Sequence, residues 1–293
     1  MGVIKSLALL FVENQSCRCG LISQFAYQGA AHMHWIILAG SRSETDPVAQ
    51  MGGEPFKALV KVAGVPMLER VVRTLFSLDG LKRVSILLQD DEPLQSRPEW
   101  HWLRQDERVR IVKSRGSASQ ALLNVMEEGE ADWPTFITTA DNVMFTPSIA
   151  RQFMQGAVDG KTEFAFATVR EQQVQAAVPE TKRTYWKFAD GGFATCNLFA
   201  LTAPQSLEAL KLWRMVEQDR KKVWKIVASF GILPLIAYRF GMLSFGGGLA
   251  RASKKLDVKV KAVALDDPRA CIDVDKPEDF VLTERLLTAP VHG

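Results

Sequence analysis

Short apolar runs alternate along the chain with longer segments in which apolar residues recur every three or four positions. The first apolar run covers 35–39, and runs at 83–88 and 109–112 have the length and β-branched content of buried strands. Between the runs, the apolar spacing predicts helices at about 66–77 and 120–129. This alternation with short connections predicts an α/β fold in which helices cover a mostly parallel sheet.

The second half of the chain has a different pattern. Aromatic and β-branched residues lie on both sides of Asp190-Gly191-Gly192, which predicts a hairpin of two strands. Residues 206–255 are expected to be mainly helical, and a last strand at 260–267 precedes a strand-turn-helix at 270–287. We therefore expect one main domain over 33–293, with a helical insertion at about 206–255.

Composition narrows the class of protein. The chain has 293 residues, of which 47% are apolar, so it can form the core of one large α/β domain. The net charge is only +3, which gives no general electrostatic case for a nucleic-acid partner. The chain has four cysteines, Cys17, Cys19, Cys196 and Cys271. They suggest neither a disulfide framework nor a zinc site, which favours a reducing, cytoplasmic environment.

The first 32 residues differ from the rest. Lys5 precedes a short apolar run, but the run is brief for a signal peptide, and no small-residue cleavage site follows at a suitable distance. We expect residues 1–32 to be a leader that is either disordered or the product of an over-extended start.

The first predicted strand runs directly into a turn of small residues. Ala39, Gly40 and Ser41 would expose backbone N–H groups to phosphate oxygens. Arg42 could hold two phosphate oxygens in a fork, and Lys57 could act as a movable charge at the bond that breaks. The alternative is an ordinary tight turn between strand and helix, since neither GxxxxGK[ST] nor GxGxxG occurs here.

The segment 35–59 and the following VAGVPMLERVVRTL resemble the signature of the MobA-like nucleotidyltransferases, LAGGxGxRxxxxKxL before a GxPML helix. Ser41 replaces a second glycine, as in the LAGxRxxxDP variant, and the resemblance extends with gaps from about Met33 to the end. It implies a three-layer α/β/α sandwich with a mostly parallel mixed sheet, a Rossmann-like fold related to glycosyltransferase-A enzymes. It also implies an enzyme that transfers a nucleoside monophosphate from a nucleoside triphosphate to an acceptor and releases pyrophosphate.

Such a transfer needs charge compensation, which Mg²⁺ or Mn²⁺ held by carboxylates would supply. Asp141 follows a buried strand and resembles the family's metal aspartate, although it could instead cap the next helix. Asp273 and Asp275 share a face if their segment is a strand, and IDVDKPEDF resembles the family's terminal DVDTPEDL. The resemblance makes Asp275 the direct ligand and Asp273 a supporting or alternate one. The alternative is a helix start that satisfies its own amides, with Asp279 as cap or ion-pair partner.

The donor should be CTP or GTP, although no residue of the sequence reads the base. Base and ribose recognition should fall to residues at the first strand end and before the helix at 120–129: Leu38, Ala39, Gly40, Ser117 and Ser119. The two serines could also cap that helix.

A phosphorylated small molecule or lipid headgroup is the expected acceptor. Lys182 and Arg183 could bind its phosphate and Asn197 could donate a hydrogen bond, while the alternative is an ordinary basic edge strand. Residues 219–245 combine basic residues with an interrupted apolar run, which favours a buried helical hairpin. The alternative for this segment is peripheral contact with the inner membrane surface. The sequence is also compatible with a homodimer.

Two rival functions share the fold. A glycosyltransferase that uses a nucleotide sugar usually carries DxD at the mid-chain strand end, whereas Asp141-Asn142-Val143 lacks the second aspartate. A non-catalytic nucleotide-binding module would be favoured if Lys57→Ala left function intact.

Overall fold

The computed structural model describes residues 33–40, 46–114, 116–129, 132–218 and 237–289. The predicted leader and most of the segment 219–245 lie outside these residues. The strands are β1 (Met33–Leu38), β2 (Lys61–Val62), β3 (Val65–Pro66), β4 (Leu81–Leu88), β5 (Val109–Lys113), β6 (Thr135–Thr139), β7 (Phe164–Arg170), β8 (Trp186–Phe188), β9 (Gly191–Leu201) and β10 (Val260–Ala264). The helices are α2 (Pro47–Gly52), α3 (Met67–Phe76), α4 (Glu92–Ser96), α5 (His101–Gln105), α6 (Ala118–Glu127), α7 (Pro147–Ala157), α8 (Glu171–Ala177), α9 (Leu207–Gln218), α12 (Phe245–Leu256) and α13 (Pro277–Thr288).

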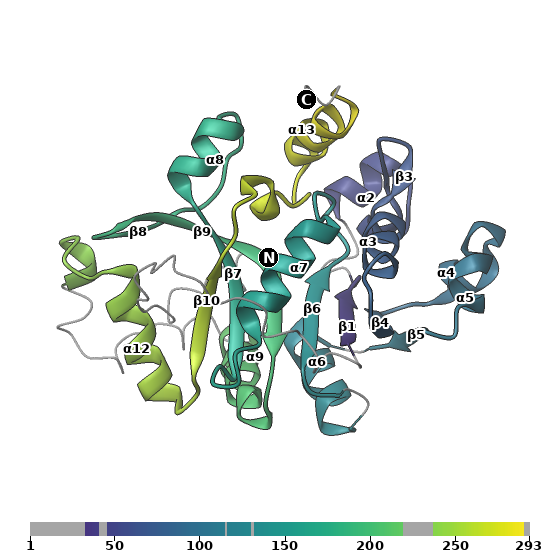
Figure 1. The fold of residues 1–293 in the computed structure, drawn as a ribbon. Coiled ribbons are helices and arrows are strands. Elements are labelled where there is room, and N and C mark those ends of the chain that lie inside the picture. Colours follow the sequence, from purple (N-terminus) through teal and green to yellow (C-terminus); the bar gives the residue numbers. More distant parts are fainter. Residues whose placement is uncertain (1–32, 41–45, 115, 130–131, 219–236, 290–293) are drawn as a thin grey trace.

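A mixed, mostly parallel sheet runs through the molecule in the order β10-β7-β9-β6-β1-β4-β5, with β8 paired to β9. β1 lies parallel to both β4 and β6, and β5 continues the parallel half. β9 runs antiparallel to β6, β7 and β8. Figure 1 shows α12 beside β10 at one edge of this sheet and α4 and α5 beside β5 at the other.

Helices cover both faces of the sheet because side chains alternate along its strands. Trp35 and Ile37 of β1 belong to a core that includes residues of α3 and α7, while Ile36 belongs to a second core with α6, α9 and α12. In the first core the rings of Trp35 and Phe136 stack with centroids 5.2 Å apart. Two apolar cores on opposite faces make the three-layer α/β/α sandwich, and the predicted fold class is confirmed.

Two local predictions need correction. Residues 270–275 are not a strand: a 3-10 turn covers Pro268–Cys271 and irregular chain follows. Pro268 has no N–H to donate to a ladder, and the Asp267 carboxylate accepts from the Arg269 N–H at 2.9 Å, which favours a turn. The β8–β9 hairpin exists, but its turn precedes the predicted glycines, since Gly191 already pairs with Phe188.

The parallel strands β1, β4 and β6 bring their carboxyl ends to one edge of the sheet. The ladder continues for one residue past β1, where the Ala39 N–H donates to the Leu87 carbonyl at 2.8 Å. One residue past β6, the Ala140 N–H donates to the Leu38 carbonyl at 3.0 Å. In open α/β sheets ligands bind beyond this edge. The hydrogen bonds of Ala39 and Ala140 therefore fix the strand ends against which a ligand would lie.

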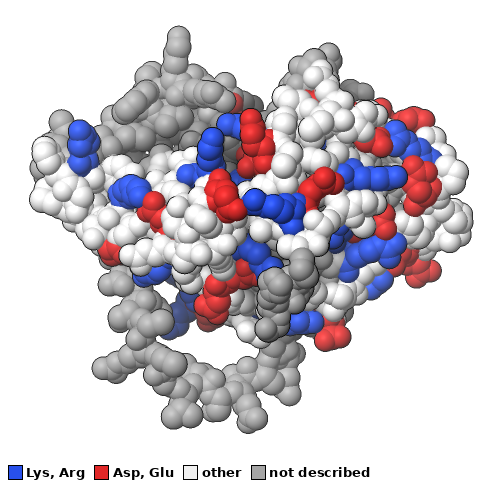
Figure 2. All heavy atoms as spheres, turned by 90° about the horizontal axis from the view of Figure 1, so that it is seen from above, with Lys and Arg blue, Asp and Glu red and all other residues white. Residues whose placement is uncertain are grey.

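The surface and the helices bear on possible partners. In the view from above in Figure 2, Lys and Arg lie among Asp and Glu, and neither sign dominates that face. Within the described ranges, every helix is too short or too polar to cross a membrane.

Candidate active site

Three aspartates meet where β6 ends. Asp141 follows β6, while Asp273 and Asp275 lie between the Pro268–Cys271 turn and α13. One carboxylate oxygen from each aspartate lies within 4.8 Å of the others. The Val274 N–H donates to the Asp141 carbonyl at 3.1 Å and so fixes the two segments against each other. The predicted metal residues therefore come together without the strand that was expected for two of them.

Lys57 places a positive charge against two of these aspartates. Its Nζ lies 2.6 Å from Asp141 Oδ2 and 3.6 Å from Asp275 Oδ1. The Thr139 hydroxyl donates to the other oxygen of Asp141 at 2.5 Å. Burial alone would lower the pKa of Lys57, but the charges of Asp141 and Asp275 raise it well above its usual range. Lys57 is therefore a fixed cation at neutral pH.

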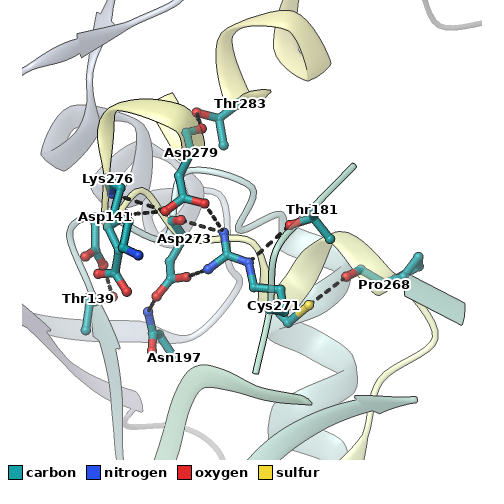
Figure 3. Close-up of polar contacts among 12 residues, drawn as sticks. Thr139, Asp141, Thr181, Asn197, Pro268, Cys271, Asp273, Lys276, Asp279 and Thr283 are labelled. Carbon is teal, nitrogen blue, oxygen red and sulfur yellow. Dashed lines mark hydrogen bonds and ion pairs between the residues drawn. The ribbon is translucent and has the colours of Figure 1, made fainter. Parts of the chain in front are cut away.

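Asp273 is held from two sides, as Figure 3 shows. Arg183 donates to its Oδ1 and, at 2.7 Å, to its carbonyl oxygen, while Asn197 Nδ2 donates to Oδ2 at 2.9 Å. The same guanidinium lies 3.2 Å from Asp279 Oδ1. Burial alone would lower the pKa of Arg183, but Asp273 and Asp279 raise it. Arg183 thus ties the segment that carries Asp275 to the start of α13.

The predicted acceptor residues do not form one site. The Arg183 side chain is only 4% exposed and is engaged by two carboxylates, and Asn197 is buried against Asp273. Both therefore position an aspartate instead of facing an acceptor. Lys182 is exposed and lines a separate hollow of about 220 Å³ with Glu180 and Arg285. Lys182 and Arg183 therefore face different surroundings, although they are neighbours in the irregular chain before β8.

A cavity of about 710 Å³ opens beside the aspartates. Asp141, Asp275 and Lys57 line one part of it, and the ends of β1 and β4 and the start of α6 line the rest. Asp46 also lines it while accepting from the N–H groups of Val48 and Ala49 at 2.9 and 3.1 Å, which starts α2. The site is thus a concave pocket whose wall carries carboxylates and a lysine ammonium group. Such pockets are the usual form of a small-molecule site.

The predicted turn at the end of β1 lies in this cavity. Leu38, Ala39 and Gly40 line it, whereas Ser41 and Arg42 lie outside the described residues. A Cβ at Gly40 would come within 2.7 Å of Gln89 Oε1, so any other residue here would displace the end of the Gln89 side chain. Gln89 itself lines the cavity and was missed, because an isolated glutamine after a strand carries no motif.

Two serines precede and begin α6. Ser117 lines the cavity and caps the helix, with its hydroxyl accepting from the Gln120 N–H at 3.4 Å. Ser119 is fully buried, and its hydroxyl donates to Glu217 Oε2 at 2.6 Å. Glu217 of α9 lines the cavity as well. Nothing in the sequence indicated Glu217, since it lies 98 positions from the serine it contacts.

The donors suit a hard divalent cation. All three aspartates offer oxygen, which Mg²⁺ and Mn²⁺ prefer. Asp141 and Asp275 line the cavity, whereas Asp273 is not among its lining residues and is held by Arg183 and Asn197. The pair Asp141 and Asp275 therefore fits a metal ion, and Asp273 supports the pair.

Similarity to known proteins bears on the family of this chain. The sequence profile of the MobA-like NTP transferase domain matches residues 35–226. No curated protein matches the chain. A hypothetical transferase from Thermus thermophilus has a similar structure, with 26% identity, a TM-score of 0.70, and coverage of 85% of this chain and 99% of that one.

Two other solved structures share the fold. A CMP:2-keto-3-deoxy-manno-octonic acid synthetase complexed with CTP gives a TM-score of 0.52 at 16% identity, covering 87% of this chain and 98% of that one. A 4-diphosphocytidyl-2C-methyl-D-erythritol synthase from Anaerococcus prevotii gives 0.53 at 11% identity, covering 89% and 97%. Because the profile spans more than half of the sequence, this chain belongs to the MobA-like NTP transferase family and is a nucleotidyltransferase.

Proposed function

We propose that this enzyme transfers a nucleoside monophosphate, with CTP as the preferred donor, to a phosphorylated small molecule or lipid headgroup in a reaction that depends on Mg²⁺. An oxygen of the acceptor phosphate attacks the α-phosphorus of the donor and forms a new P–O bond. The bond from the α-phosphorus to the oxygen that bridges to the β-phosphorus breaks, and pyrophosphate leaves with that electron pair.

One observation carries the proposal: Lys57, Asp141 and Asp275 converge on the wall of a single cavity, with Nζ 2.6 and 3.6 Å from the two carboxylates. Lys57 would neutralise the triphosphate as charge builds on the leaving group, and Arg42 would add a second cation. Asp141 and Asp275 would hold the metal ion, which supplies charge compensation. A fixed cation and fixed carboxylates need little reorganisation during the reaction.

The residues after Asp141 favour this reaction over transfer from a nucleotide sugar. In a DxD motif the second aspartate would stand at Val143, and Asn142, at the middle position, is buried and donates to the Thr138 hydroxyl at 3.2 Å. Asn142 therefore braces β6. The residue after it, Val143, is also buried and offers no oxygen ligand from its side chain.

The donor, the compartment and the partners complete the proposal. CTP is placed ahead of GTP because one similar fold is a synthetase complexed with CTP and another is a diphosphocytidyl synthase. We place the enzyme in the cytoplasm, where nucleoside triphosphates and Mg²⁺ are available. The proposal also includes peripheral contact of residues 219–245 with the inner membrane surface. It includes a homodimeric state as well.

Pyrophosphate release tests the reaction. The protein is incubated with each of the four nucleoside triphosphates, Mg²⁺ and a pool of phosphorylated metabolites or lipid extract. We expect release with CTP that depends on both the pool and the metal. If no triphosphate gives pyrophosphate under conditions in which nucleotide binding is measured, the proposed transfer is wrong.

Two variants separate the roles in the site. Lys57→Met should lower the rate about 100- to 1,000-fold while nucleotide binding persists, because its charge acts mainly on the developing leaving group. Lys61→Met is the matched control, since Lys61 is an exposed lysine of β2 that does not line the cavity. Equal rates for the two variants would refute the role of Lys57.

A further inference from the structure

Glu217 has an unusual position for a surface carboxylate. It lies in the last turn of α9, a helix that packs against α6, and its side chain forms part of the cavity wall. The rest of the lining comes from the ends of the parallel strands, the 3-10 turn Lys57–Leu59, the starts of α2 and α6, and the segment before α13. Glu217 thus adds a carboxylate to the cavity wall from a different helix than the elements that carry Asp46, Asp141 and Asp275.

The contacts of Glu217 fix its orientation. Oε2 accepts from the Ser119 hydroxyl at 2.6 Å and from the Ser119 N–H at 3.3 Å. Ser119 is fully buried and lies in the first turn of α6, so the carboxylate occupies the positive end of that helix. Both hydrogen bonds within the described chain use Oε2, and Oε1 makes none there. A phosphate group would be repelled from this place, because a carboxylate already occupies it.

The strand order shows which end of a nucleotide would meet Glu217. The metal-binding pair lies where β6 ends, and the cavity crosses β1 and β4 to Ser114 after β5. Three strand spacings make this about 14 Å. If the phosphates lie at Asp141 and Lys57, as the proposed function requires, the base lies at the other end. There the lining includes Leu87, Ser117, Ala118, Ala121 and Glu217.

We infer that Glu217 reads the base and selects cytosine over uracil by accepting a hydrogen bond from the exocyclic 4-amino group. This inference rests on the proposed function. Cytosine presents an amino donor at a position where uracil presents a carbonyl oxygen, and a carboxylate accepts from the former and repels the latter. The anchor on Ser119 holds the carboxylate in place, so little side-chain freedom is lost when the base binds.

Equilibrium binding of CTP and UTP, with Mg²⁺ and without acceptor, tests the inference. The wild-type protein should bind CTP about 10- to 100-fold more tightly than UTP, the range expected for one hydrogen bond to a charged group. Glu217→Gln should remove most of this preference, because its amide can also donate to the uracil carbonyl. Glu208→Gln, an exposed position in the first turn of α9, should keep the preference.

The ligand gives a second test that needs no variant. The triphosphate of pyrimidin-2-one riboside carries hydrogen in place of the 4-amino group, and the wild-type protein should bind it about 10- to 100-fold more weakly than CTP. If Glu217 only caps α6, Glu217→Gln will lower stability and leave the ratio of the CTP and UTP dissociation constants unchanged. That result would refute the inference and leave the proposed function in place. Absence of binding by all four triphosphates would refute both.

Discussion

We expect His34 to make the stability of this enzyme depend on pH. It lies on the central strand β1, is fully buried, and its Nε2 lies 2.8 Å from the Ser85 hydroxyl of β4. No described residue pairs with its Nδ1. Burial first, and then the nearby charge of Arg83, lower the pKa of His34 from 6.5 to about 4. The folded protein therefore keeps the imidazole neutral under conditions in which the unfolded chain protonates it.

The sign and size of the effect follow from this difference. Between pH 6.5 and about 4 the unfolded state binds more protons, so the free energy of unfolding falls as the pH falls. The contribution of His34 is complete above pH 6.5. With these pKa values the loss is about 2 kcal/mol at pH 5 and about 3 kcal/mol at pH 4. Such a loss is a large part of the stability of an ordinary domain.

Urea denaturation of the wild type and of His34→Gln across pH 4 to 7.5 measures this contribution. Glutamine can still bond to Ser85 but cannot titrate, so the variant should lose less stability on acidification by about 2 kcal/mol at pH 5. Carboxylates that titrate in the same range affect both proteins equally. Parallel curves for the two proteins would show that His34 is not kept neutral by the fold.

Three further predictions concern the site. Gly40→Ala should raise the KM for the nucleotide about 10-fold with an unchanged melting temperature, since its Cβ would meet Gln89 Oε1 at 2.7 Å. A Gly40→Ala/Gln89→Ala double variant should recover part of the lost affinity, and a KM that stays as high as in Gly40→Ala would show that the contact with Gln89 is not the cause. Arg183→Met should lower the free energy of unfolding in urea by about 3–5 kcal/mol, because it leaves Asp273 without its buried cation. The double variant Arg183→Met/Asp273→Asn should recover part of that free energy, whereas no recovery would indicate that Arg183 acts only through apolar packing. Asp275→Asn should abolish the thermal stabilisation by Mn²⁺ that we expect of the wild type, whereas Glu278→Gln, on the first turn of α13, should keep it; equal Mn²⁺ shifts in both variants would exclude Asp275 as a ligand.

Much of the fold could be predicted because its signals are local. The period of apolar residues in β1, β4 and β6 and in α3 is visible within ten residues, and those elements are where it placed them. The segment with Asp273 and Asp275 reads as a strand by the same rule and is not one. Its alternating apolar residues, Ile272 and Val274, are buried, but no strand of the described chain pairs with its backbone, and the Val274 N–H donates to the Asp141 carbonyl instead. Alternation therefore predicted which residues are buried and missed the backbone conformation.

The contacts of the site could not be predicted in the same way, because they join distant positions. Arg183 lies 90 positions from Asp273, and Glu217 lies 98 from Ser119. In sequence, Lys182-Arg183 is simply a basic pair, and only the structure separates an exposed lysine from a buried arginine. Arg183, which we expected to bind an acceptor phosphate at the surface, is instead buried and paired with the Asp273 carboxylate.

The balance of charges in this network connects the buried arginine to the proposed chemistry. Among the described residues, the ion pairs join four carboxylates, from Asp141, Asp273, Asp275 and Asp279, to two cations, Lys57 and Arg183. Two negative charges remain, which is the charge that one divalent metal ion would neutralise. Each cation is paired with two carboxylates, so one negative charge remains with Asp141 and Asp275 on the cavity wall and one remains behind it, where Arg183 is enclosed with Asp273 and Asp279. Replacing Arg183 with a neutral residue should therefore change metal affinity as well as stability, although its side chain does not reach the cavity wall.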